Sequence, residues 1–166
     1  YATGNEHSFT FTPDDNAEYG VSLTVTDDDG GIGTDATTIA VTNVAPTLLL
    51  SGDSAVAEGA PYTLTLASSD PGTDTISAWA ITWGDGNVET VSGNPPSITH
   101  VYAEGPNSYT ISATATDEDG TYAASNTVDV GVANLAPVVD AGPDKTVNEG
   151  STFTSTGSFT DPGADT

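Results

Sequence analysis

Acidic side chains in short glycine-containing turns are the residues of this chain best suited to chemistry. They stand in the segments DDDG, DPGTD and DEDG as Asp27 and Asp29, Asp70 and Asp74, and Asp117 and Asp119. Ca²⁺ takes about six to eight oxygen ligands, usually several carboxylates together with backbone carbonyls. Turns of this kind can therefore form a calcium site where they converge. The alternative is that these Asp residues cap ordinary turns through their side chains, and the residue types leave both interpretations open.

The remaining residues give little support for catalysis or for zinc binding. His100 and His7 have no Ser or Cys nucleophile in a recognisable motif beside them, nor the further His residues that a zinc site needs. We expect both to hydrogen-bond across the fold. Paired carboxylates can serve a glycosidase, but here they recur in repeated turns without marking one as catalytic. We predict that the chain is not an enzyme.

The charge balance excludes two classes of partner. Lys145 is the single Lys or Arg against 24 Asp and Glu, which gives a formal charge of -23 at pH 7. Nucleic-acid backbones and anionic lipid surfaces require clustered cations, so neither is a predicted partner. No apolar run reaches about 18 residues and no basic stretch precedes an apolar one, so we predict no membrane insertion in this segment. Cys is absent, which excludes disulfides and thiolate metal sites.

The chain repeats itself at an interval of about 90 residues. Residues 41–75 align with 132–166 at an offset of 91, pairing Ala45-Pro46 with Ala136-Pro137, and 19–30 align with 109–120 at an offset of 90. Cutting at the Ala-Pro linkers gives a leading segment (1–44), which is the C-terminal half of a repeat, a complete central repeat (45–135), and a trailing segment (136–166), which is the N-terminal half of the next. We expect the chain to be a piece of a longer protein.

The central repeat has the pattern of a β-sandwich. Apolar residues alternate with polar ones in short runs such as Tyr62, Leu64 and Leu66, and no segment shows a helical period. Turn-forming clusters of Gly, Pro, Asn and Asp separate the runs. The predicted strands lie at 47–57 with a break at Gly52-Asp53, 61–67, 76–83, 87–92, 97–102, 108–116 and 121–132. About seven short strands in 90 residues predict an all-β, immunoglobulin-like sandwich.

The same residues resemble the PKD (polycystic kidney disease) domain. The family pattern of an aromatic strand ending in Gly-Asp-Gly is met by Trp79 to Gly86, with Ile81 where the family usually has Trp. Its later elements are met by His100-Val101-Tyr102, by Tyr109-Thr110-Ile111 and by Asp117 to Gly120. The segment Ser69 to Gly72 is similar to the family's Ser-x-Asp-Pro-Asp-Gly, with one Asp missing. The resemblance implies an immunoglobulin-like fold that recurs in bacterial surface proteins. The linkers and acidic loops are also similar to cadherin-type repeats, whose junctions bind calcium.

Topology predicts which acidic loops meet. With the seven predicted strands lettered A to G in chain order, the B–C and F–G loops lie where the chain enters the sandwich, and the A–B, C–D and E–F loops lie where it leaves. We call these two ends the incoming and outgoing poles. The incoming pole is predicted to gather Asp70, Asp74, Asp117 and Asp119 beside Asn43, and Asp27 and Asp29 are their counterparts in the leading segment. The outgoing candidates are Glu58, Asn134, Glu149, Asp161 and Asp165. Asp85, between two glycines, is interpreted as a turn residue rather than a ligand.

Three functions follow as hypotheses. The first is a structural one, in which the repeats are calcium-rigidified spacers of a stalk, adhesin or fibre at the cell surface or outside the cell. The second is an accessory module that binds polysaccharide or a cell-surface protein through its strand faces. This hypothesis predicts that Trp79 and Trp83 are exposed, whereas they are buried if they belong to the core of the sandwich. In the third, copies of the chain complete one another's partial repeats by strand addition and form a filament.

Overall fold

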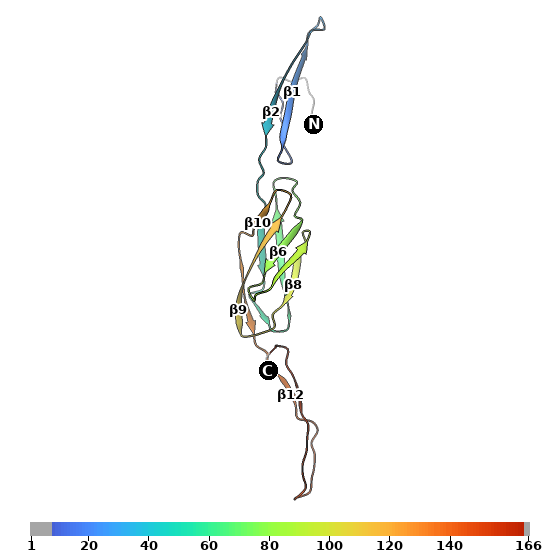
Figure 1. Ribbon diagram of the computed structural model, residues 1–166, viewed down its shortest axis with the longest axis vertical. Helices are drawn as coiled ribbons and strands as arrows, with labels where there is room; N and C mark the ends of the chain where they lie inside the picture. The colour runs from blue at the N-terminus through green and yellow to red at the C-terminus, as the bar shows by residue number, and fades with distance from the viewer. Residues whose placement is uncertain (1–7, 165–166) are drawn as a thin grey trace.

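The computed structural model describes residues 8–164, and every regular element in that range is a β-strand. Figure 1 shows three parts following one another along the long axis of the molecule. A hairpin of β1 (Glu18–Thr26) and β2 (Ile32–Ala40) comes first, and the central repeat follows it. The short strands β12 (Val138–Asp140) and β13 (Ser158–Thr160) pair in the trailing segment.

The central repeat is a sandwich of two sheets. The three-stranded sheet has the order β3-β5-β8, from β3 (Thr47–Gly52), β5 (Pro61–Ser69) and β8 (Ser97–Val101). The second has the order β4-β11-β9-β6-β7, from β4 (Ala55–Ala57), β11 (Val128–Ala133), β9 (Asn107–Thr116), β6 (Ala78–Thr82) and β7 (Val88–Ser92), and β10 (Thr121–Ala123) also pairs with β9. The predicted all-β, immunoglobulin-like class is confirmed.

The first strand of the sandwich changes sheets at its predicted break. β3 pairs antiparallel with β5, whereas β4 pairs parallel with β11 in the opposite sheet. The Tyr62 hydroxyl fills the space that a β-carbon on Gly52 would need, and it donates a hydrogen bond of 2.9 Å to the Asp53 carbonyl. Glycine is therefore required where the chain crosses from one sheet to the other.

The last strand is interrupted where the sequence predicts a continuous one over 121–132. It forms β10 and β11, separated by residues 124–127. In the gap, the Asn126 side chain accepts from the Leu50 amide (2.9 Å) and donates to the Leu50 carbonyl (2.8 Å), and the Ser125 amide donates to the Leu48 carbonyl. These bonds satisfy the open edge of β3, which a continuous strand in the other sheet would leave unpaired.

Large apolar side chains from both sheets fill the core. Trp79, Ile81 and Trp83 have no exposed surface, as the alternation in this strand predicts. Leu48, Leu50, Tyr62, Leu64 and Leu66 face them from the other sheet. The Trp79 indole N–H donates to the Asn94 amide oxygen at 3.0 Å, so its polar edge is satisfied at the rim of the core. The expectation that both Trp residues are core residues is confirmed.

His100 and Asp85 join the two sheets at the outgoing pole. The His100 ring stacks on Trp83 with centroids 4.6 Å apart, and its Nε2 lies 2.8 Å from an Asp85 carboxylate oxygen. Burial raises the pKa of Asp85, but hydrogen bonds from Asn87 and His100 outweigh it and hold the pKa below its usual value. Asp85 sits in a turn, as predicted, and the positive φ angles belong to the flanking Gly84 (88°) and Gly86 (97°). His7 lies outside the described residues.

The flanking segments leave apolar side chains uncovered that their counterparts in the central repeat bury. Leu23 is 63% exposed in β1, whereas Ala113 at the matching position of β9 is 6% exposed. Val139 in β12 is 77% exposed, and Leu48 at its matching position is 1% exposed. Within residues 8–164, only the central repeat forms a closed two-sheet core.

Replacing Ile81 tests whether this core holds the sandwich together. Ile81→Ala removes a fully buried side chain between the two Trp residues, and we expect it to lower the free energy of unfolding by about 2–5 kcal/mol. Urea denaturation followed by tryptophan fluorescence measures this loss. Val88→Ala is the matched control in the neighbouring strand, because Val88 is 66% exposed and should change stability by less than about 0.5 kcal/mol. Equal effects of the two substitutions would contradict this core assignment.

Candidate cation site at the incoming pole

The B–C loop (70–77) and the F–G turn (117–120) meet at the incoming pole because β5 and β9 both end there. Ser77 ties the two together, with its amide and its hydroxyl donating to the Thr116 carbonyl at 2.7 and 2.9 Å. Within the loops, Asp70 Oδ1 accepts from the Gly72 amide at 2.7 Å. Asp117 Oδ1 accepts from the amides of Asp119 and Gly120, both at 2.9 Å. Each aspartate thus uses one oxygen to fix its own turn.

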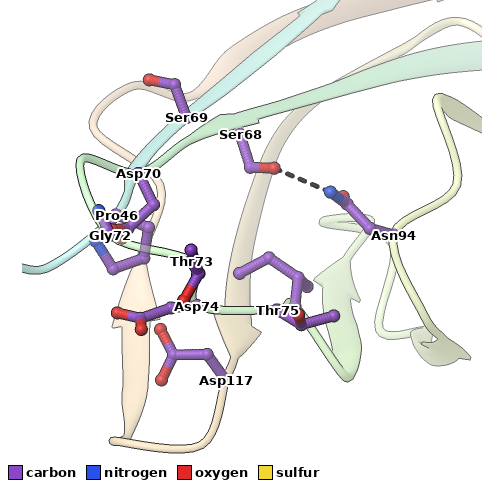
Figure 2. Close-up of a pocket in the computed structure, with 11 residues that line it drawn as sticks. Pro46, Ser68, Ser69, Asp70, Gly72, Thr73, Asp74, Thr75, Asn94 and Asp117 are labelled. Carbon is purple, nitrogen blue, oxygen red and sulfur yellow. Dashed lines mark hydrogen bonds between the residues drawn. The ribbon is translucent and has the colours of Figure 1, made fainter. Parts of the chain in front are cut away.

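The second oxygens of these side chains are buried and unsatisfied. Among the described residues, Asp70 Oδ2, Asp74 Oδ1 and Asp117 Oδ2 are shielded from solvent and have no hydrogen-bond partner. One carboxylate oxygen from each of the three lies within 4.8 Å of the others. Figure 2 shows the Asp74 and Asp117 carboxylates facing each other, in a hollow of about 290 Å³. Asp117 is only 6% exposed, so its free oxygen cannot turn to bulk water.

The electrostatics of this group are unfavourable without a counter-charge. The single Lys of the chain, Lys145, lies in the trailing segment, where it donates to the Thr154 carbonyl. Burial raises the pKa of Asp74, and the negative charges of Asp70, Asp119, Glu118 and Asp15 raise it further. Clustered carboxylates with buried oxygens that lack hydrogen bonds favour either a proton or a cation.

The leading segment contributes to a second acidic group. One oxygen each from Asp15, Asp74 and Asp119 lies within 4.8 Å of the others, so Asp74 belongs to both groups. The Asn16 side chain donates to Asp119 at 2.7 Å. Sequence reasoning missed Asp15, although its topology rule places E–F loops at the pole facing the next repeat. Applying that rule to residues 13–19 of the leading segment would have found it.

Three of the other predicted ligands of the incoming side have different surroundings. The Asn43 side-chain amide donates to the Tyr122 hydroxyl at 2.8 Å, and this bond places Asn43 at the incoming pole. Asp27 lies at the far end of the β1–β2 hairpin, where its Oδ1 accepts from the amides of Asp29 and Gly31 at 3.1 and 2.6 Å. Asp27 and Asp29 therefore form a turn similar to that of Asp117 and Asp119, and within residues 8–164 they belong to no acidic group.

The predicted ligands of the outgoing side do not gather into such a group within the described part of the chain. Glu58 is fully buried and accepts from two backbone amides, as described below. Asp161 Oδ1 accepts from the Gly163 amide at 3.1 Å, which repeats the turn made by Asp70. Asn134 lies in the linker, and Glu149 is exposed in the trailing segment. Asp165 lies outside the described residues.

Comparison with known proteins decides the family. A family model described as "PKD domain" matches residues 43–132, which is more than half of the chain. The chain belongs to the PKD domain family. The resemblance of the Trp79-to-Gly86 and His100-to-Tyr102 motifs is thereby confirmed. The match identifies one PKD domain, and the assignment of the flanking segments to further copies stays a prediction.

Solved structures add two similar chains. The PKD domain of an M14-like peptidase from Thermoplasmatales archaeon SCGC AB-540-F20 is 27% identical, with a TM-score of 0.46, and the match covers 55% of this chain and 99% of that one. The amphioxus IgVJ-C2 molecule is 21% identical, with a TM-score of 0.43, over 70% of this chain and 60% of the other. No protein among those with curated descriptions matches.

PKD domains are typically accessory or spacer modules, of a type common in extracellular proteins. Among residues 8–164, no helix has the length and apolar character needed to cross a bilayer.

Replacing Asp74 tests the repulsion between carboxylates at the incoming pole of this PKD domain. Because the folded state raises the pKa of Asp74, it binds more protons than the unfolded chain between the usual and the raised value. This residue therefore makes the free energy of unfolding fall as pH rises through that window. In chelator at neutral pH, we expect Asp74→Asn to raise the melting temperature and to remove its part of the pH slope.

Glu89→Gln is the matched control for the loss of one negative charge, because Glu89 is exposed in β7, away from the cluster. Calorimetry across pH compares the two variants with the parent chain. A lower melting temperature for Asp74→Asn at neutral pH would contradict the repulsion.

Proposed function

We propose that this PKD domain is a calcium-binding spacer of an extracellular stalk, adhesin or fibre, and that it has no catalytic activity. The observation that carries the proposal is that two carboxylates use their two oxygens differently. Asp70 and Asp117 each commit one oxygen to their own turn and keep the other buried and unpartnered beside Asp74. A group built only to cap turns has no need for buried oxygens without partners.

The donor set fits a hard divalent cation. The three side chains offer only oxygen, which favours Ca²⁺ or Mg²⁺ over metals that prefer nitrogen or sulfur ligands. Ca²⁺ accepts irregular geometry and about six to eight oxygens, so backbone carbonyls and water would complete the three carboxylates. Binding would neutralise the repulsion that raises the pKa of Asp74.

The position of the acidic groups supports a role at the junction between repeats. Asp74 belongs to the group within the central repeat and to the one that includes Asp15 of the leading segment. A cation bound at Asp74 would draw the two parts together, whereas empty carboxylates push them apart. In arrays whose units contact only their neighbours, the junctions set the stiffness of the whole, which is the property that a spacer needs.

In the central repeat, the His and Trp side chains that could serve catalysis or glycan binding are held in the fold. His100 is stacked on Trp83 and bonded to Asp85, with little exposed surface. Trp79 and Trp83 are fully buried, which counts against a sugar-binding platform on this strand. Polysaccharide or a cell-surface protein as partner therefore remains the less supported alternative.

A second candidate is assembly with copies of the chain by strand addition. It is favoured by the uncovered apolar residues Leu23 and Val139, whose counterparts in the central repeat are buried. Sedimentation velocity would then show species larger than the monomer that increase with concentration. A single monomeric species at all concentrations would remove this candidate.

Calorimetry in calcium and in chelator tests the cation site. A ligand at about 100 times its dissociation constant adds about 2.7 kcal/mol to the free energy of unfolding, so we expect a clear rise in melting temperature with Ca²⁺. Asp117→Asn should abolish the rise, because it removes the charge while an amide oxygen can still accept from the turn amides.

Glu89→Gln is the matched control and should keep the full calcium response. Sodium chloride at equal ionic strength separates specific binding from screening. If the parent chain showed no shift, or if Asp117→Asn kept it, the calcium part of the proposal would be wrong and the spacer part would stand.

A further inference from the structure

The outgoing pole of the central repeat contains a buried carboxylate that the cation site does not use. Glu58 follows β4 directly and has no exposed surface. Its Oε2 accepts from the Gly105 amide and its Oε1 accepts from the Leu135 amide, both at 2.7 Å. Gly105 belongs to the E–F loop, and Leu135 belongs to the linker that leads into the trailing segment. One side chain therefore fixes both pieces of backbone that border the exit of the chain.

A loop of the trailing segment packs against this carboxylate. The Ala164 amide donates to the Ala103 carbonyl of the E–F loop at 2.9 Å. A β-carbon on Gly163 would lie 2.7 Å from the Glu58 carboxyl carbon, so any larger residue would be forced off the surface. On the other side of the contact, a β-carbon on Gly59 would lie 2.5 Å from the Pro162 carbonyl oxygen, and the φ of Gly59 is +71°. Both sides of the contact therefore depend on glycine.

The junction with the leading segment uses the same docking mode. The Thr73 amide donates to the Asp14 carbonyl at 2.9 Å, and the Thr73 hydroxyl donates to it at 3.1 Å. Thr73 and Ala164 are equivalent at the offset of 91 residues. Asp14 and Ala103 both lie in E–F loops, although the offset of 90 pairs Asp14 with Glu104, the neighbour of Ala103. The two junctions are built from different residues, but each contains a hydrogen bond from the B–C loop of one segment to the E–F loop of the segment before it.

We infer that the outgoing pole is a docking socket for the Asp-Pro-Gly loop of the following repeat, with Glu58 as the residue that positions it. Charge-assisted hydrogen bonds hold the E–F loop and the linker in the one arrangement that the glycine loop fits. The partner is recognised by its chemistry, which is a B–C loop with glycine at the place of Gly163 and a free amide at the next residue. The socket sets the angle between repeats through contacts of the chain itself, because backbone amides bind both Glu58 oxygens and hold the E–F loop and the linker in place.

Distance measurement between spin labels tests the socket in the full chain. The chain has no Cys, so Thr90→Cys and Ser155→Cys place one label on an exposed strand of the central repeat and one in the trailing segment. Double electron–electron resonance in chelator should give one narrow distance distribution for the parent sequence. Gly163→Ala should broaden or shift it, and so should Glu58→Gln, whose amide group would face a backbone donor. Gly33→Ala should leave it unchanged, because a β-carbon there meets nothing within 4 Å.

Each outcome decides for or against the socket. A broad distribution in the parent chain, or an unchanged one in Gly163→Ala, would overturn it. Tryptophan fluorescence reports whether Glu58→Gln keeps the central repeat folded. If it does not, Gly163→Ala decides alone, since Gly163 lies outside the sandwich. The measurement is made in chelator, so it does not depend on whether the incoming pole binds calcium.

Discussion

Carboxylates in this chain must be satisfied almost without cationic side chains, since one Lys stands against 24 Asp and Glu. Salt bridges to Lys or Arg cannot organise such a molecule, so backbone amides take their place. Asp27, Asp70, Asp117 and Asp161 each accept from amides of their own turn. Glu58 accepts from two amides of different loops. The glycine-rich turns are therefore the source of hydrogen-bond donors that lets so acidic a chain fold.

The two poles of the central repeat use this constraint in opposite ways. At the outgoing pole, both oxygens of Glu58 are occupied, and the carboxylate is a fixed part of the surface that receives the trailing segment. At the incoming pole, the buried oxygens of Asp70, Asp74 and Asp117 have no partner among the described residues. Among the described residues, one pole thus holds its buried carboxylate by backbone amides, and the other keeps buried carboxylate oxygens without a partner. A repeat with this asymmetry has a defined direction in any array.

The sequence was sufficient for the features that depend on local pattern. Alternation placed Trp79, Ile81 and Trp83 in the core, and the Gly52-Asp53 break located the change of sheet. A topology rule brought Asp70, Asp74 and Asp117 to one end. The sequence did not reveal that the Asn126 side chain would take the place of a stretch of strand, because this depends on a long-range contact with Leu50. The sequence also did not reveal that Glu58 would accept from the amides of Gly105 and Leu135, because it does not show which backbone amides will face a carboxylate.

The shared docking mode of the two junctions has a mechanical consequence. A flexible linker makes the end-to-end distance of a string of units grow roughly with the square root of their number. Junctions that fix the same rotation at every step generate a screw instead, and its length grows in direct proportion to the number of units. A single glycine in each B–C loop, at the place of Gly163, would then determine whether a chain of such repeats transmits force as a rod or yields as a coil.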